Sequence, residues 1–116
     1  MDKFNKGEVW FVVFPFEEDT SKFTNRPVIV LDEDTLGVLS VKVTKHKVRD
    51  SDPFDTPILY WEQAGLRVAS TARISKVMNL RADDFICIIG KLHPDDLKKI
   101  EEAYIKFMSE QNKTTE

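Results

Sequence analysis

The stretch R-P-V-I-V-L, residues 26–31, carries the clearest fold signal in the chain. The run from Val28 to Leu31 is apolar and mostly β-branched, which predicts a strand covered on both faces. Pro27 fixes the backbone at the start of this strand, so the guanidinium of Arg26 is held on a rigid element. Most single arginines are ordinary surface residues, but an always-charged group with five donors at this position is suited to gripping an anion.

Further strand signals lie on both sides of this stretch. Residues 7–14, G-E-V-W-F-V-V-F, form another apolar run, and residues 38–45 alternate between apolar and polar side chains. The alternation predicts that Ser40, Lys42 and Thr44 share one solvent-exposed face. The other segments expected to form strands are residues 56–61, 68–77 and 85–92.

One helix is predicted near the C-terminal end of the chain. Pro94 suits its first position, and Asp95 and Asp96 suit the positive end of the helix dipole. Apolar side chains then recur at helical spacing, which predicts a face packed on the core: Leu97, Ile100, Tyr104, Phe107 and Met108. Several short strands with one terminal helix predict a mainly β fold, either a strongly curled antiparallel sheet or a partly open barrel.

Composition restricts the classes of protein to which the chain can belong. Its 116 residues predict one domain, residues 1–110, followed by a polar tail at residues 111–116. The net charge of −3 argues against a surface coated with positive charge for nucleic acid. No apolar run approaches the roughly 20 residues that span a bilayer, and the first residues do not resemble a signal peptide, so we expect a cytoplasmic protein without a membrane segment.

Cysteine and histidine usage predicts neither a metal site nor a bound cofactor. Cys87 is the only cysteine, and we expect its thiol to be buried and inert. The two histidines, His46 and His93, are far apart in the sequence and have no metal-ligand spacing. His93 precedes Pro94 and is interpreted as a helix-start residue.

Any polyanion would therefore have to meet a local basic patch. The candidate is K-V-T-K-H-K-V-R, residues 42–49, in which Lys42, Lys45, Lys47 and Arg49 occur without an acidic residue between them. Composition alone favours an ordinary solvated loop for this segment.

The motifs, taken in order, resemble the MazF/PemK (Kid) toxins of bacterial type II toxin-antitoxin systems. The matching segments are K-G-E-V-W at 6–10, F-P-F at 14–16, R-P-V-I-V-L at 26–31, V-T at 43–44 and I-G-K-L at 89–92. The resemblance implies an SH3-like barrel of the PemK/CcdB type, a homodimer, and a metal-independent ribonuclease that cleaves single-stranded RNA. It also implies a cognate antitoxin, DNA binding by the toxin–antitoxin complex, and growth inhibition.

The resemblance assigns catalytic roles to two residues. Arg26 occupies the place of the arginine in the family's Arg-Pro motif, and Thr44 that of its catalytic threonine. The family commonly has serine after this threonine, where the chain has Lys45. In the PemK branch an arginine and an aspartate two residues later contribute, and these positions align with Arg73 and Ser75. A serine cannot replace a carboxylate base, so that role is not carried over.

Chemistry explains why such residues would suit RNA cleavage. The ribose 2′-hydroxyl can attack the adjacent phosphorus, leaving a 2′,3′-cyclic phosphate and a 5′-hydroxyl. The reaction needs stabilisation of charge on the phosphorane oxygens and proton transfer at the entering and leaving oxygens. We expect Arg26 to stabilise the charge and Thr44 to supply a hydroxyl. His46 is a candidate proton carrier because histidine is the side chain that most often exchanges protons under physiological conditions, although the identity of the general base stays open.

Further residues are expected to contact the RNA. Lys45, Lys47 and Arg73 are candidate phosphate contacts, and His46 is a candidate contact beside them. Among the aromatic residues that could stack on bases, Phe16 is the strongest candidate and Phe54 a second. Trp61 could also stack, but most aromatic side chains in a small domain belong to the core, so only Phe16 and Phe54 are favoured.

Two other interpretations remain open at this stage. The same fold supports gyrase poisons of the CcdB kind, which act by protein contact without cleaving nucleic acid. A catalytically silent relative that keeps the fold and a regulatory partner is the other, and Lys45, Ser75 and the acidic net charge favour it.

Overall fold

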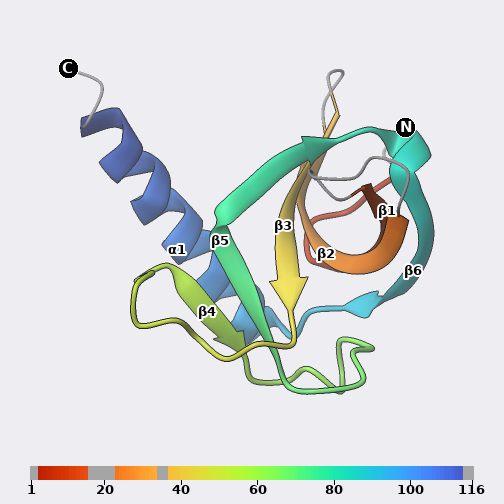
Figure 1. Cartoon of the computed structure of the whole chain (residues 1–116), viewed down its shortest axis with the longest axis horizontal. Helices are drawn as coiled ribbons and strands as arrows, with labels where there is room; N and C mark the ends of the chain where they lie inside the picture. Colours follow the sequence, from red (N-terminus) through yellow and green to blue (C-terminus); the bar gives the residue numbers. More distant parts are fainter. Residues whose placement is uncertain (1–2, 16–22, 34–36, 114–116) are drawn as a thin grey trace.

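Antiparallel strands in the described part of the chain form a single six-stranded sheet (Figure 1). The structure is a computed structural model, and it describes residues 3–15, 23–33 and 37–113. The strands are β1 (Glu8–Pro15), β2 (Phe23–Glu33), β3 (Val38–Thr44), β4 (Asp55–Ile58), β5 (Ser70–Leu80) and β6 (Phe85–Lys91). Their order in the sheet is β4-β5-β3-β2-β1-β6, and a short 3-10 turn, η1 (Ala82–Asp84), precedes β6.

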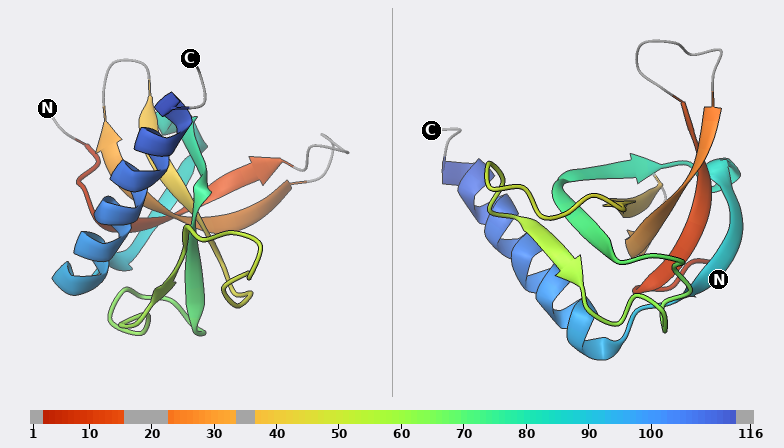
Figure 2. Two further views of the ribbon diagram at one scale, coloured as in Figure 1. Left: turned by 90° about the vertical axis from the view of Figure 1, so that its left-hand side faces the viewer. Right: turned by 60° about the horizontal axis from the view of Figure 1, so that its bottom comes forward.

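Shifts in register make this sheet curl. They interrupt the pairing of β1 with β6, of β2 with β3, and of β3 with β5. An extra residue on one strand bends that strand and increases its twist. The sheet therefore wraps into a partly open barrel with β4 and β6 as its end strands (Figure 2). The predicted fold class, a mainly β barrel with one C-terminal helix, is confirmed.

The helix α1 (Pro94–Lys113) covers the barrel beside β4 and β5, as both views of Figure 2 show. Ile100 is fully buried among β-branched core residues such as Ile29 and Ile74. Each such side chain contributes about 1.5–3 kcal/mol by leaving water. The predicted apolar face packs on this core except for Met108, which is 38% exposed. The helix ends at Lys113 and so includes three of the residues assigned to the tail.

The prediction of a solvent-exposed row on β3 was wrong for two of its three residues. Ser40 and Thr44 are both buried. Ser40 lies opposite Val30 in the ladder with β2, and a second core cluster of Phe4, Val30 and Val38 covers this face. The Ser40 hydroxyl donates to the carbonyl oxygen of Val38 at 3.1 Å. Period-two alternation identified the strand, but β3 has neighbours on both sides and is covered on both faces.

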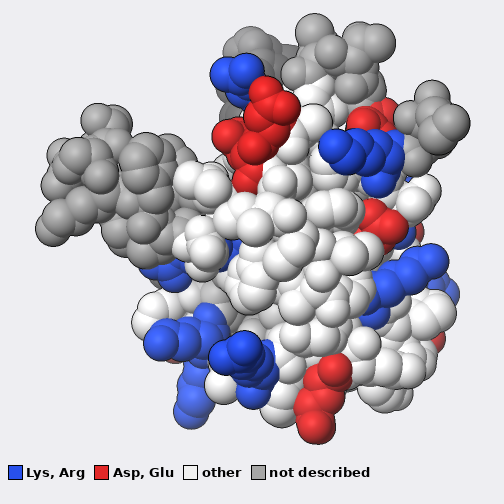
Figure 3. Space-filling view, turned by 90° about the vertical axis from the view of Figure 1, so that its right-hand side faces the viewer, with Lys and Arg blue, Asp and Glu red and all other residues white. Residues whose placement is uncertain are grey.

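The expectation of a buried Cys87 was also wrong. This residue lies on β6, and its side chain is exposed. Its neighbours Ile86 and Ile88 are 48% and 50% exposed, and β6 is an end strand of the described sheet. Figure 3 faces this side of the molecule, and its centre is free of charged side chains.

The strand predicted at residues 56–61 ends earlier than expected. The segment expected to be a strand from 56 to 61 is extended only over Asp55–Ile58, and residues 59–65 form turns instead. The carboxylate of Asp96 accepts hydrogen bonds from the backbone N–H groups of Leu59 at 3.1 Å and Tyr60 at 2.8 Å. These bonds end the strand. None of the helices in residues 3–15, 23–33 and 37–113 is long and apolar enough to cross a membrane.

Candidate functional site

A pocket of about 440 Å³ lies at the end of the barrel where β3 ends and β5 begins. We call it the Arg26 pocket. Its polar lining residues are Asn25, Arg26, Thr44, Lys45, Arg67 and Ser70. Arg26 and Thr44, the two catalytic candidates, therefore come together although they lie on different strands. In Figure 3, Lys and Arg side chains gather at the lower left, toward this end of the molecule.

Arg26 is held at the pocket wall by its position within β2. It pairs with Val12 of β1 and is half-buried. None of the residues that the structure describes forms a hydrogen bond or ion pair with its guanidinium, and the described pocket lining contains no Asp or Glu. Its donors are therefore available to an anionic ligand.

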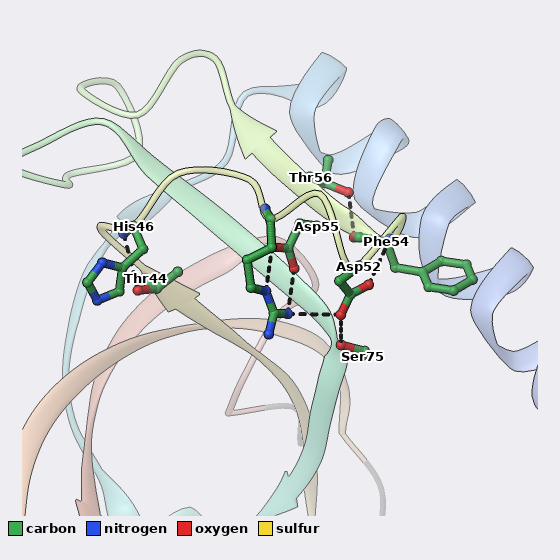
Figure 4. Close-up of polar contacts among 8 residues, drawn as sticks. Thr44, His46, Asp52, Phe54, Asp55, Thr56 and Ser75 are labelled. Carbon is green, nitrogen blue, oxygen red and sulfur yellow. Dashed lines mark hydrogen bonds and ion pairs between the residues drawn. The ribbon is translucent and has the colours of Figure 1, made fainter.

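Thr44 is the last residue of β3, and it is 5% exposed. The backbone N–H of His46 donates to its Oγ1 at 3.3 Å (Figure 4). Since a threonine hydroxyl has one proton and two lone pairs, this contact occupies a lone pair and leaves the O–H free to donate. The hydroxyl can therefore act as a hydrogen-bond donor in the pocket.

Arg49 fastens the loop that follows Thr44. Its Nε and Nη2 atoms donate to the two carboxylate oxygens of Asp55 at 2.8 Å, and Nη2 also donates to Asp52 at 2.8 Å. The hydroxyl of Ser75 on β5 donates to the same Asp52 oxygen (Figure 4). These hydrogen bonds lower the pKa of Asp55 and raise that of Arg49, because each stabilises the charged form of its partner. We call this network the Arg49 clamp.

The predicted RNA contacts divide into three groups. Lys45 lines the Arg26 pocket, whereas His46 and Lys47 line a second cavity that adjoins it. Arg73 lines neither cavity. It lies on β5, opposite Lys42 of β3 and Asp55 of β4. Its Nε is buried without a hydrogen-bond partner among the described residues. Phe16 lies outside the described residues.

Sequence reasoning missed Asn25, Arg67 and Ser70. Asn25 precedes Arg26 on β2, and the other two belong to the segment from residue 59 to 70. Gly65 in this segment has a φ of +89°, and a Cβ there would lie 2.4 Å from the carbonyl oxygen of Ile89 on β6. Only glycine suits such a close approach. The glycine in the stretch Q-A-G-L-R was therefore the sequence signal for this part of the pocket, because it fixes the wall that carries Arg67.

Metal-ligating residues do not cluster near the pocket. In residues 3–15, 23–33 and 37–113, no group of three or more His, Cys, Asp or Glu side chains could hold a metal ion. The polar groups that line the pocket are cations, the hydroxyls of a threonine and a serine, and an asparagine amide.

Comparison with solved structures shows the same fold in other proteins. A mycobacterial endoribonuclease solved in complex with its cognate antitoxin superposes with a TM-score of 0.70 at 14% identity, covering 94% of this chain and 96% of that one. A second mycobacterial endoribonuclease gives 0.70 at 15% identity with 94% of both chains covered. The Mycobacterium tuberculosis toxin MazF-mt6 gives 0.61 at 18% identity, covering 82% and 91%.

Comparison of sequences shows the family. A search of curated proteins found no match to the chain. The model of the family described as "PemK-like, MazF-like toxin of type II toxin-antitoxin system" matches residues 5–108, nearly the whole chain. The resemblance identified from the short motifs is thereby confirmed, and the chain belongs to the PemK-like, MazF-like toxins of type II toxin-antitoxin systems.

Proposed function

We propose that the chain is an endoribonuclease toxin that cleaves single-stranded RNA and is neutralised by a cognate antitoxin. The observation that carries the proposal is the meeting of Arg26 and Thr44 in one pocket whose described lining has no acidic residue. Family membership and the mycobacterial endoribonucleases of the same fold support it.

In the proposed mechanism the substrate supplies its own nucleophile, the ribose 2′-hydroxyl. As the 2′-oxygen attacks the adjacent phosphorus it loses its proton, and negative charge builds on the non-bridging oxygens. The bond from phosphorus to the 5′-oxygen then breaks as that oxygen takes up a proton. Arg26 donates two parallel hydrogen bonds to those oxygens, because its guanidinium is planar and its donors are uncommitted. The Thr44 hydroxyl donates a hydrogen bond to the same oxygens. Lys45 and Arg67 line the pocket as further positive charges.

We further propose that the chain pairs with a second copy through β6. This end strand leaves its outer edge unpaired within the described sheet, and Ile86, Cys87 and Ile88 are exposed along it. Apolar side chains on an open sheet edge favour association. Light scattering should give about twice the chain mass of 13.4 kDa. Ile88→Lys should yield a monomer, and a monomeric parent protein would contradict the proposal.

Incubation with single-stranded RNA tests the main proposal. We expect fragments with 2′,3′-cyclic phosphate and 5′-hydroxyl ends, formed equally well with and without EDTA. Arg26→Ala and Thr44→Val should both lose this activity while keeping the thermal unfolding of the parent. Lys98→Ala, on the exposed face of α1, serves as the matched control and should cleave normally. If the folded parent leaves RNA intact but inhibits gyrase, the CcdB-like alternative is correct.

A further inference from the structure

A second cavity adjoins the Arg26 pocket, and the proposed cleavage reaction does not use it. It has a volume of about 480 Å³ and shares two of its lining residues, Lys45 and Ser70, with the pocket. We call it the Trp61 hollow. Thr44 of the pocket and Thr71 of the hollow are paired across β3 and β5. Paired residues of an antiparallel ladder lie about 5 Å apart, so an RNA strand that leaves the pocket can pass directly into the hollow.

The lining of the hollow combines apolar walls with a basic rim. Trp61 is half-buried, and Leu59 and Val48 beside it are 57% and 43% exposed. His46 and Lys47 are exposed at the rim together with the shared lysine, and the described lining contains no Asp or Glu. Proteins that bind single-stranded nucleic acid use this combination, because bases stack on flat apolar groups while cations follow the phosphates.

Two networks hold the hollow in place. Asp96 is 1% exposed and bonds the backbone N–H groups of Leu59 and Tyr60 at the start of the turn that carries Trp61. The Arg49 clamp fixes the opposite rim, since it anchors the loop of His46 and Lys47. The walls are therefore positioned without a ligand, which lowers the entropic cost of binding one.

We propose that the Trp61 hollow binds the base of the nucleotide next to the cleaved phosphate. This inference rests on the proposed function and adds a subsite to it. The base lies against Trp61 and Leu59, and its phosphate lies at Lys45 and Lys47. The Ser70 hydroxyl donates to the carbonyl oxygen of Val68 at 2.8 Å, so it presents lone pairs to the occupant. An N–H group on the edge of the base satisfies them.

A substitution that fills the hollow tests the proposal. Ala69 lines the hollow and is exposed, so Ala69→Trp places an indole there without opening the core. Ile105→Trp, at a residue of α1 that is 67% exposed, is the matched control. The probes are an RNA of about ten nucleotides, made uncleavable by 2′-O-methyl groups, and an abasic strand of the same length and charge.

Stacking of one base predicts a defined loss. Ala69→Trp should bind the RNA about 5- to 150-fold more weakly than the parent and should bind the abasic strand equally well. Ile105→Trp should match the parent with both probes. Unchanged RNA affinity in Ala69→Trp, or an equal loss with the abasic strand, would overturn the proposal. Should Ala69→Trp fail to fold, Leu59→Ser removes the exposed apolar wall and should show the same selective loss.

Two further measurements separate the possible causes of failure. Cleavage of unmodified RNA by the parent protein tests the proposed function alone. If the parent cleaves RNA and Ala69→Trp keeps the same base preference, only the subsite proposal is overturned. A parent that neither cleaves nor binds RNA overturns both proposals. Poly-L-glutamate is the third probe: if Ala69→Trp loses binding to it and keeps binding to RNA, the hollow is a site for an acidic peptide, which contradicts the subsite.

Discussion

Arg26 and Arg49 are both half-buried, and they have opposite surroundings. The guanidinium of Arg49 bonds two carboxylates, whereas Arg26 has no such partner among the described residues. An arginine whose donors are satisfied within the protein holds the chain in place, and one whose donors are free can hold a ligand. In the proposed mechanism, this difference separates the part of the molecule that positions the site from the part that acts in it.

Arg73 lies between these extremes. Its positive charge contributes to the lowered pKa of Asp55, yet its Nε is buried without a hydrogen-bond partner in the described part of the chain. Its place outside both cavities puts it with the Arg49 clamp rather than with the pocket. The RNA contact expected for Arg73 stays a prediction, and we propose from its effect on Asp55 that it has a positioning role.

The largest effect should follow from removing the free arginine. Arg26→Ala should reduce single-turnover RNA cleavage by roughly 100- to 1000-fold, equivalent to about 2.7–4 kcal/mol of transition-state stabilisation. Arg26→Lys should remain strongly impaired, because lysine keeps the charge and loses the planar fork. Binding of uncleavable RNA should change much less in both variants. Cleavage by folded Arg26→Ala at the parent rate would show that the pocket is not the active site.

A smaller and different effect should follow from breaking the Arg49 clamp. Asp55→Asn keeps the size of the side chain but removes the charge that pairs with Arg49, so Tm should fall by several degrees near neutral pH. Cleavage at saturating RNA should fall far less than in Arg26→Ala, since the pocket arginine is untouched. Thermal unfolding and single-turnover rates measured on the same variant check both points. A loss of cleavage as large as that of Arg26→Ala, without loss of stability, would contradict the division of roles.

The Asp55→Asn variant also tests how the stability of the fold depends on pH. The folded-state pKa of Asp55 is lowered, first by its hydrogen bond from Arg49, so the stabilisation is present above the unfolded-state value of about 3.9. It is lost as the pH falls through the folded-state pKa, where the carboxylate takes up a proton. The difference in Tm between the parent and Asp55→Asn should therefore be constant near neutral pH and shrink below about pH 4. A difference that grows on acidification would have the wrong sign.

The sequence predicts the elements better than it predicts the cavities. The R-P-V-I-V-L strand and the helix that begins at Pro94 depend on local patterns, and both are found. Arg26 and Thr44 could be assigned to one site because the family resemblance gives both a catalytic role. The wall that carries Arg67 depends instead on Gly65 packing against β6, a contact between residues far apart in the chain. Local alternation contains no information about such contacts.

Burial was mispredicted for the same reason. Ser40 and Cys87 both lie in recognised strands, so their local structure was predicted well. Whether a strand face is covered depends on what packs over it. Phe4 contributes to the cluster on the face of Ser40, whereas Cys87 lies on β6, an end strand of the described sheet. The Trp61 hollow was missed likewise, because three separate segments supply its walls.

The smallest effect should come from the exposed lysines at the rim. Lys47 lines the Trp61 hollow and has no ion pair among the described residues, so it meets the RNA as a single charge in water. Each phosphate contact on a single strand contributes about 0.7 to the slope of log affinity against log salt concentration. Lys47→Ala should reduce the slope by about this amount, weaken binding to RNA and to the abasic strand alike, and leave cleavage at saturation nearly unchanged. Lys98→Ala, on α1, should keep the parent slope.

A different outcome would contradict this division of roles. If Lys47→Ala lowers cleavage at saturation as strongly as Arg26→Ala, the charge at the rim acts on the transition state. The distinction between the arginine of the pocket and the cations around it would then be wrong.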